Sequence, residues 1–306
     1  AGTRAALVST WMTQLAPARW VLERIAGVDR RRPLPPFARQ TFDTWWKGRN
    51  GGRNPERHAA SSTGAASGRT KVALFADTFM RFNYPEIGHA AVRLFESLGY
   101  EVIVPNVTCC GRPMISKGLL SAAKTHAQDN LAALLPLARA GIPIVGCEPS
   151  CILTFRDEVP DLVPGPDSEL LAGHTFLVDE FLHRHVQEHG WPQSSPGGTV
   201  LLHGHCHQKA IVGTRPAVSV LKAAGFEVEE VDSGCCGMAG SFGFEREHYD
   251  ISMAIGERRL LPAVRRVPAE TEVVAMGVSC RQQIAHGTGR RAKHLVELLA
   301  PASVAV

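Results

Sequence analysis

From Lys71 onward, short apolar and β-branched runs alternate with longer segments whose apolar residues recur at helical spacing. This pattern predicts the strands Lys71–Phe75, Tyr100–Val104 and Ile142–Val145, separated and followed by the helices Pro85–Leu98, Ser116–Ala140 and Ser168–Glu188. The same order then returns, with strands at Thr199–Leu202, Phe226–Val231 and Glu272–Ala275 and helices at Pro216–Ala224 and Glu245–Leu261. Such alternation indicates an α/β fold with parallel sheets and helical crossovers.

The two halves of this pattern form an internal repeat. Leu98-Gly-Tyr-Glu-Val precedes Thr108-Cys-Cys-Gly by the same step that separates Ala224-Gly-Phe-Glu-Val from Gly234-Cys-Cys-Gly. Downstream, each copy reaches a Ser-Cys pair just past a predicted strand, ending at Cys151 and Cys280. Upstream, the register aligns Thr78 with Cys206, so cysteine fills four of the aligned positions in the second copy and three of them in the first. We therefore expect residues 71–190 and 191–306 to be two tandem repeats.

Residues 1–70 differ from the rest of the chain in charge and pattern. They contain 12 Lys and Arg against 4 Asp and Glu, whereas the whole chain has a net charge of only +4. Apolar positions at helical spacing predict one helix within residues 7–25 and a second from Phe37 to Trp46, followed by a Gly- and Ser-rich linker at Gly51–Gly68. No stacking motif or extended basic face accompanies this charge, so we expect a helical segment that packs on protein and no nucleic-acid partner.

Composition narrows the class of protein further. At 44% hydrophobic residues the chain can bury a sizeable core, and no apolar run reaches the roughly 18 residues of a transmembrane span. The sequence shows neither a transmembrane segment nor a secretory signal, which favours a cytoplasmic protein, with peripheral association at the inner face of a membrane left open. Eight cysteines in 306 residues are too few for a disulfide scaffold, and thiol ligands or redox thiols fit a reducing compartment better.

Each repeat places its cysteines just after three neighbouring strands. The carboxyl ends of parallel strands share one edge of a sheet, so thiols far apart in sequence converge there. Adjacent cysteines are awkward for the tetrahedron of a single zinc ion, but each can bind a different iron atom of a cluster. An iron–sulfur cluster is therefore the favoured interpretation, and a structural zinc site or thiol–disulfide chemistry remain open alternatives.

The doubled Cys-Cys-Gly motif resembles the cysteine-rich CCG domains found in heterodisulfide reductase, in the glycolate oxidase iron–sulfur subunit and in anaerobic glycerol-3-phosphate dehydrogenase. The stretches Glu148-Pro-Ser-Cys, His205-Cys-His-Gln-Lys and Ser233-Gly-Cys-Cys-Gly-Met-Ala-Gly-Ser-Phe-Gly are similar, more closely still, to the C-terminal part of bacterial FAD-linked D-2-hydroxyacid dehydrogenases of the D-lactate or D-2-hydroxyglutarate type. The resemblance covers residues 71–300 and implies two tandem Rossmann-like repeats. It also implies that the basic segment, residues 1–70, is a linker that follows a ferredoxin-like domain.

Residue by residue, the resemblance implies one [4Fe–4S] cluster ligated by Cys206, Cys235, Cys236 and Cys280. For the first copy it implies the ligands Cys109, Cys110 and Cys151, so a second cluster is open. Asp77 or Thr78 is a candidate oxygen ligand, and a supporting or purely structural role is an equal alternative. Cys147 aligns with Met276, and we interpret it as a buried small residue.

Glycine and histidine residues flank these cysteines. Gly111 and Gly237 follow the cysteine pairs, where positive φ lets the backbone approach a bulky ligand and their amides donate to sulfur. In His-Gly-His-Cys-His, the residues His203, His205 and His207 resemble a zinc-binding tract. We favour a role for His205 and His207 in donating hydrogen bonds to the cluster or its thiolates.

No Gly-x-Gly-x-x-Gly follows a strand in this sequence, so it shows no flavin or nicotinamide site. The leading hypothesis is an electron-transfer module of an oxidoreductase, taking electrons from FAD on a partner subunit or a missing domain and passing them to a quinone or another carrier. The alternatives are a thiol/disulfide enzyme like heterodisulfide reductase and a non-redox zinc scaffold.

Overall fold

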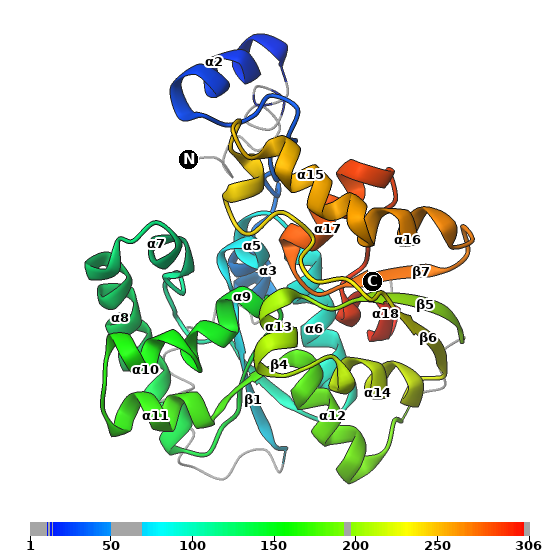
Figure 1. Ribbon diagram of the computed structural model, residues 1–306. Helices are drawn as coiled ribbons and strands as arrows, with labels where there is room; N and C mark the ends of the chain where they lie inside the picture. The colour runs from blue at the N-terminus through cyan, green and yellow to red at the C-terminus, as the bar shows by residue number, and fades with distance from the viewer. Residues whose placement is uncertain (1–10, 12, 14, 50–68, 193–196, 303–306) are drawn as a thin grey trace.

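Two parallel sheets form where the sequence predicts strands, and helices cover them in the computed structural model (Figure 1). The structure describes residues 11, 13, 15–49, 69–192 and 197–302. The first sheet has the order β2-β1-β3-β4, with β1 at Lys71–Phe75, β2 at Glu101–Ile103, β3 at Ile144–Gly146 and β4 at Thr175–Leu177. The second sheet has the order β6-β5-β7, with β5 at Gly198–His203, β6 at Phe226–Glu230 and β7 at Glu272–Ala275. The predicted α/β fold with two tandem parallel-sheet repeats is confirmed.

The helices repeat in the same register as the strands. After the central strand of each sheet comes a short helix and then an amphipathic crossover: α5 (Thr78–Phe82) and α6 (Pro85–Ser97) in the first repeat, α13 (Cys206–Ile211) and α14 (Arg215–Ala223) in the second. Between the second and third strands lie α7 (Arg112–Ser116) and α8 (Leu120–Arg139), matched by η2 (Phe242–Phe244), α15 (Tyr249–Arg258) and α16 (Leu260–Arg266). The third strand leads into α9 (Pro149–Ile152) or α17 (Val278–Thr288). The remaining helices of the first repeat are η1 (Leu153–Phe155), α10 (Glu158–Leu162) and α11 (Pro166–Gly173).

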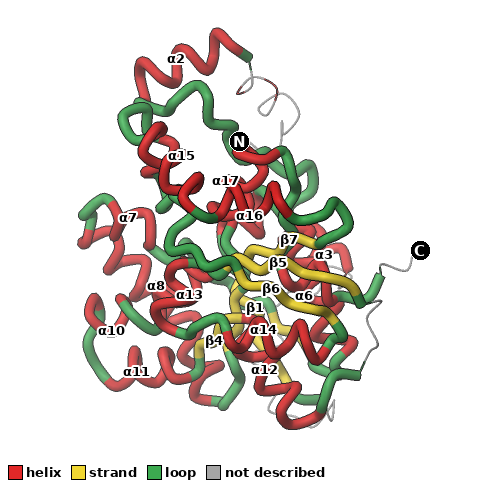
Figure 2. Tube along the Cα trace, turned by 45° about the vertical axis from the view of Figure 1, so that its right-hand side comes forward, coloured by secondary structure: helices red, strands yellow, loops and turns green. Residues whose placement is uncertain are grey.

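The last helix of each repeat packs on the other repeat. Helix α12 (Val178–His189), which follows β4, lies against α14 of the second repeat, as Figures 1 and 2 both show. Helix α18 (Leu295–Leu299), which follows a parallel bridge between Val274 and Lys293, packs against α6 of the first repeat. This exchange joins buried residues of both repeats, including Leu182, Val220 and Leu295, into one hydrophobic core. The two sheets are therefore held in a fixed relation by apolar burial.

Within the two repeats, three predicted helices differ from the structure, and each difference has a local cause. The segment Ser168–Glu188 is interrupted by β4, which pairs with β3 in a short, mostly buried strand that helical periodicity conceals. The long helix begins at Leu120 because Gly118 adopts a φ of 72°. The segment predicted from Glu245 starts at Tyr249 and divides into α15 and α16 at Arg259, whose φ is −145°.

The front segment contacts both repeats. Its two described helices are α2 (Ala16–Ala26) and α3 (Phe42–Arg49), so the second starts five residues later than predicted, and the predicted linker lies outside the described residues. Phe42 of α3 is fully buried against Gly88 of the first repeat. Between the helices, residues 27–32 pair with the second repeat, where Asp29 N donates to Phe244 O and Arg246 N donates to Gly27 O. Figure 1 shows α2 beyond α15 at one end of the molecule.

Among the described helices, none combines the length and apolar character needed to cross a lipid bilayer.

Candidate metal centre

The four cysteines of the second repeat converge at the carboxyl edge of its sheet. Cys206 is the first residue of α13 after β5, Cys235 and Cys236 follow β6, and Cys280 lies in the first turn of α17 after β7. The thiols form a continuous chain of contacts, from Cys206 to Cys235, from Cys235 to Cys236 and from Cys236 to Cys280. Hydrogen bonds within this chain hold the pKa of Cys235 and of Cys280 below the ordinary thiol range. Bonding to these two thiols and burial raise the pKa of Cys206 and of Cys236, so the site gathers four sulfur donors of which two have thiolate character in the absence of a bound group.

The first repeat builds the same arrangement with three thiols. Cys109 contacts Cys110, Cys110 contacts Cys151, and the hydroxyl of Thr78 contacts Cys109 at the place that Cys206 occupies in the other repeat. Thr78 is the first residue of α5, just as Cys206 is the first residue of α13. The aligned register of the sequence is thus also the register of the structure. The hydrogen bond with Cys110 lowers the pKa of Cys151, but burial together with the nearby Asp77, Glu148 and Cys109 outweighs it, and the pKa rises to about 11.

Both glycines after the cysteine pairs adopt the conformation that the sequence predicts. The φ of Gly111 is 86° and that of Gly237 is 96°, a region that residues with a side chain rarely enter. The amide of Gly237 donates to Cys235 Sγ at 3.3 Å, and the amide of Gly111 bonds the thiol of Cys109 in the same way. A Cβ on Gly237 would stand 2.2 Å from the carbonyl oxygen of Ser252. The turn after Cys235 and Cys236 therefore needs glycine for space as well as for its backbone conformation.

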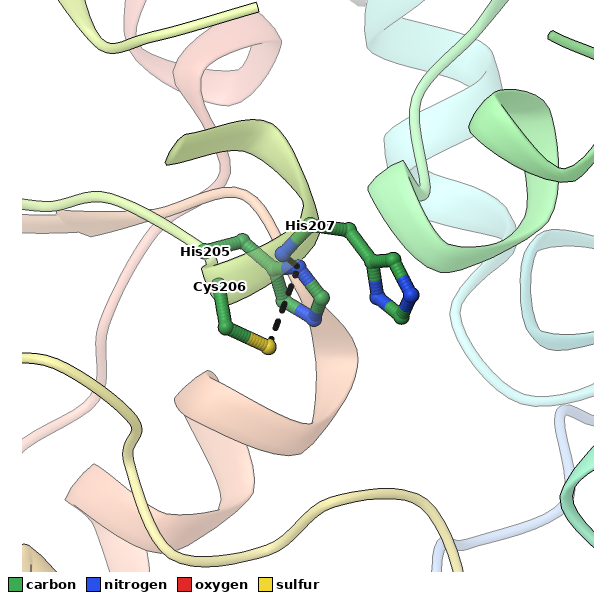
Figure 3. A group of neighbouring side chains, drawn as sticks. All are labelled: His205, Cys206 and His207. Atoms are coloured by element: carbon green, nitrogen blue, oxygen red, sulfur yellow. Dashed lines mark hydrogen bonds between the residues drawn. The ribbon is translucent and has the colours of Figure 1, made fainter. Parts of the chain in front are cut away.

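The histidines around Cys206 have distinct roles (Figure 3). Ligand atoms of His205, Cys206 and His207 lie within 4.8 Å of one another, the spacing of a candidate metal site. His205 Nδ1, however, accepts the hydrogen bond of the His207 amide and so caps α13. Burial lowers the pKa of His205 and keeps the ring neutral, and its remaining N–H is directed to Ser150 Oγ at 3.3 Å. His205 therefore holds the helix that presents Cys206, and its Nδ1 also lies 3.9 Å from Cys206 Sγ, within hydrogen-bonding distance of the thiol (Figure 3).

His203 is the histidine that lies against Cys280. Its Nδ1 bonds Ser233 Oγ at 2.9 Å, and its Nε2 is buried with no oxygen or nitrogen partner in the described part of the chain. Cys236 and then His203 lower the pKa of Cys280 against the opposing effect of burial. His207 Nδ1 is likewise buried and unpartnered among the described residues, and burial lowers the pKa of this ring to about 4.

Glu148 links the two thiol sites, a role that its sequence context did not indicate. It caps the turn that carries Cys151, while its Oε2 accepts the amide of Val278 at 2.8 Å, two residues before Cys280. Its Oε1 accepts from Ser150 Oγ, which in turn accepts from His205. Burial raises the pKa of Glu148 to about 8. Gly277 aligns with Glu148, and a side chain there would collide with His205. The only sequence signal was the motif Glu148-Pro-Ser-Cys itself.

Two further residues of the first repeat fall near the site. Cys147 is buried, as expected for a packing residue, and its carbonyl accepts a hydrogen bond from His294 Nε2 at 3.0 Å. Asp77 accepts the amides of Phe79 and Met80 as the cap of α5, which is a structural use of the carboxylate that was a candidate oxygen ligand.

The comparisons with known proteins agree with this geometry. The sequence model of the cysteine-rich domain (CCG) matches residues 72–156 and 200–285, one match per repeat. The anaerobic glycerol-3-phosphate dehydrogenase of Escherichia coli has a subunit that is 29% identical over 296 residues, which cover 95% of this chain and 70% of the relative. D-2-hydroxyglutarate dehydrogenase of Pantoea ananatis is 28% identical over 75% of this chain but only 22% of its own length. A lactate utilization protein of Macrococcus caseolyticus is 26% identical over 75% of this chain and 96% of its length.

Proposed function

Because this chain belongs to the cysteine-rich (CCG) domain family, which matches it in both repeats, we propose that it is an iron–sulfur electron-transfer module. It takes electrons from the flavin of a dehydrogenase and passes them to a further carrier, such as a quinone. Two of the relatives are named as a dehydrogenase or part of one and the third is named for lactate utilization, which supports an oxidoreductase system that acts on a small hydroxy compound.

The observation that carries this proposal is the unbroken chain of four thiols in the second repeat. Soft thiolate donors on three neighbouring strand ends fit an iron–sulfur cluster, and adjacent Cys235 and Cys236 suit several iron atoms better than one zinc ion. The buried Nε2 of His203 and the amide of Gly237 supply polar groups beside the sulfurs. The donor set and its surroundings therefore fit the group.

When bound, such a cluster supplies reversible one-electron transfer. The chain's own residues hold it: Cys206, Cys235, Cys236 and Cys280 as the ligands of a [4Fe–4S] cluster in the second repeat, and Cys109, Cys110 and Cys151 as ligands in the first. Glycine amides donate to the sulfurs and stabilise their negative charge. Cys236 and Cys280 are buried while Cys206 is exposed, so the protein shields the inner two thiols from water.

The test is elemental and spectroscopic. The full chain, purified without oxygen, is expected to contain iron and acid-labile sulfide, to absorb broadly in the visible range and to give a paramagnetic signal on one-electron reduction. A chain that contains neither iron nor sulfide under these conditions would overturn the proposal. The coding sequence upstream of residue 1 is expected to encode a flavin-binding domain, in the same frame or as a neighbouring subunit.

A zinc scaffold is the second candidate, because His205, Cys206 and His207 lie at metal-ligand spacing. His205 Nδ1 already caps α13, so binding of zinc through that nitrogen would require it to leave the cap. Zinc in place of iron in the elemental analysis would support it. A heterodisulfide reductase-like activity is the third candidate, and a paramagnetic signal that changes with a substrate disulfide would distinguish it from electron transfer alone.

A further inference from the structure

The second thiol site receives a buried arginine from the front segment. Arg32 lies in the front loop, defined here as residues 27–32 between α2 and α3, and only 1% of its surface is exposed. The loop is anchored by backbone pairing with residues 244–246, directly after the segment that carries the cysteine pair. Arg19 of α2 donates to the carbonyls of Asp29 and Arg32 and fixes the turn. The conformation of the front loop therefore places the Arg32 guanidinium inside the second repeat.

All three donor edges of the Arg32 guanidinium are used, each on a different element. Nε donates to Gly243 O at 2.6 Å, Nη1 to Gln283 Oε1 at 2.6 Å and Nη2 to Ser252 Oγ at 2.7 Å. These acceptors belong to the loop after the cysteine pair, to α17 and to α15. A planar fork that satisfies three elements at once fixes their relative positions in a way that a flexible lysine does not.

The residues that Arg32 holds are those that support the thiols. Gln283 lies one helical turn after Cys280 on α17, and its Nε2 donates to Ser252 O at 3.0 Å. That same carbonyl oxygen lies against the Cα of Gly237, where a Cβ would approach it to 2.2 Å. Arg32 thus braces the Cys236–Gly237 turn on one side and the Cys280 helix on the other.

The charge of Arg32 is buried without an ion-pair partner. Among the described residues, no carboxylate forms a salt bridge with it, although its neighbour Arg31 pairs with Asp29 and Asp250. Burial lowers the pKa of Arg32, while Tyr249, Asp29 and the Cys236 thiol oppose this effect. A buried cation with no paired carboxylate is costly unless an anionic group lies nearby. Of the groups that favour the charged guanidinium, Cys236 belongs to the second site, so a cluster held there would add negative charge near Arg32.

We infer that Arg32 is a positioning residue of the second thiol site: it locks the Cys236–Gly237 turn against α17, and its buried positive charge raises the reduction potential of the cluster held there. This inference rests on the proposed function for its redox part alone. A one-electron reduction makes the cluster more negative by one charge, and a fixed cation stabilises that state more than the oxidised one. Through Arg32, the basic front segment is therefore part of the second thiol site.

The test compares Arg32→Gln and Arg32→Lys with Arg31→Gln, which removes the same charge one residue away from a half-exposed side chain. Potentials are measured by anaerobic redox titration of the paramagnetic signal. Arg32→Gln is expected to shift the potential of the second-repeat cluster to a more negative value, whereas Arg32→Lys keeps most of the wild-type potential and Arg31→Gln leaves it unchanged. An unchanged potential in a folded Arg32→Gln chain would overturn the electrostatic role.

The positioning role is tested without metal, by hydrogen exchange of the amides of residues 237–245 in the iron-free chain. Arg32→Gln and Arg32→Lys are both expected to speed exchange in this loop by about tenfold, because the three-way fork is lost in each. Exchange as slow as in Arg31→Gln would overturn the positioning role. A chain that never binds iron would defeat the proposed function, while this measurement would still decide whether Arg32 holds the loop.

Discussion

The two repeats share one backbone plan but differ in how each thiol site is completed. In the first repeat, Thr78 stands where the second repeat has Cys206. Asp77 caps α5 of the first repeat, and His205 caps the equivalent helix α13 of the second. Glu148 of the first repeat reaches the α17 amide of the second, while its counterpart Gly277 only makes room for His205. The second site alone also receives Arg32 from the front loop. A duplicated fold can therefore keep its strand-end geometry while the chemistry of its two sites diverges.

The largest effect should come from removing a central thiol of the second site. Cys236→Ser is expected to abolish the second-repeat cluster, because Cys236 contacts both Cys235 and Cys280 and links them into one donor set. The measurement is iron and acid-labile sulfide per chain after anaerobic purification. Cys147→Ser, also a buried thiol, is the matched control and should retain the cluster. Equal losses in the two variants would contradict the assignment.

Exchanging the residue that distinguishes the repeats should sharpen the comparison. Cys206→Thr gives the second site the donor set of the first and should speed iron release to a chelator by at least about tenfold, the effect of losing even a supporting contact of a metal site. Thr78→Cys places a fourth thiol next to Cys109 and should raise the iron and sulfide content per chain. Iron content that is insensitive to both changes would mean that these helix-start positions do not ligate.

The two glycines should differ in their tolerance of a side chain. Gly237→Ala combines positive φ with a 2.2 Å approach to Ser252 O, so we expect a loss of about 3 kcal/mol in the free energy of unfolding. Gly111→Ala has the same φ problem but its nearest neighbour atom is 3.5 Å away, so we expect about 1 kcal/mol. Urea unfolding of the iron-free variants gives both values. The reverse order would show that the loop after Cys236 is looser than described.

The last comparison concerns the pH dependence of stability and depends on Glu148, which Gly277 replaces in the other repeat. Burial raises its folded pKa to about 8, above its unfolded value. Between those two pKa values the unfolded state releases the proton and the folded state keeps it, so stability falls as pH rises, by up to about 1.4 kcal/mol per pH unit. Glu148→Gln should flatten this part of the pH profile of the iron-free chain, measured by unfolding between about pH 5 and about pH 8. The exposed Glu169→Gln should leave the slope unchanged.

Sequence periodicity predicted six of the seven strands in the described residues and the convergence of the thiols. Helix α6 follows its pattern closely because Ile87, Ala91 and Leu94 face the core at regular spacing. Strand β4 was missed because three residues between two helices give no period of their own, and only pairing with β3 identifies them. The roles of His205 and Glu148 were missed for a related reason. A ring nitrogen that caps a helix and a carboxylate that reaches another repeat leave no mark in local pattern.

The sequence by itself determined the duplication, the register of the two repeats and the set of cysteines that meet at each sheet edge. Those properties follow from spacing along the chain, because the carboxyl ends of parallel strands coincide whatever else surrounds them. Only the tertiary structure decided that Arg32 of the front loop bonds Gln283, one helical turn after Cys280, and that Glu148 reaches the start of α17. Such contacts depend on how helices and loops pack on one another, and packing is the property that local sequence specifies least.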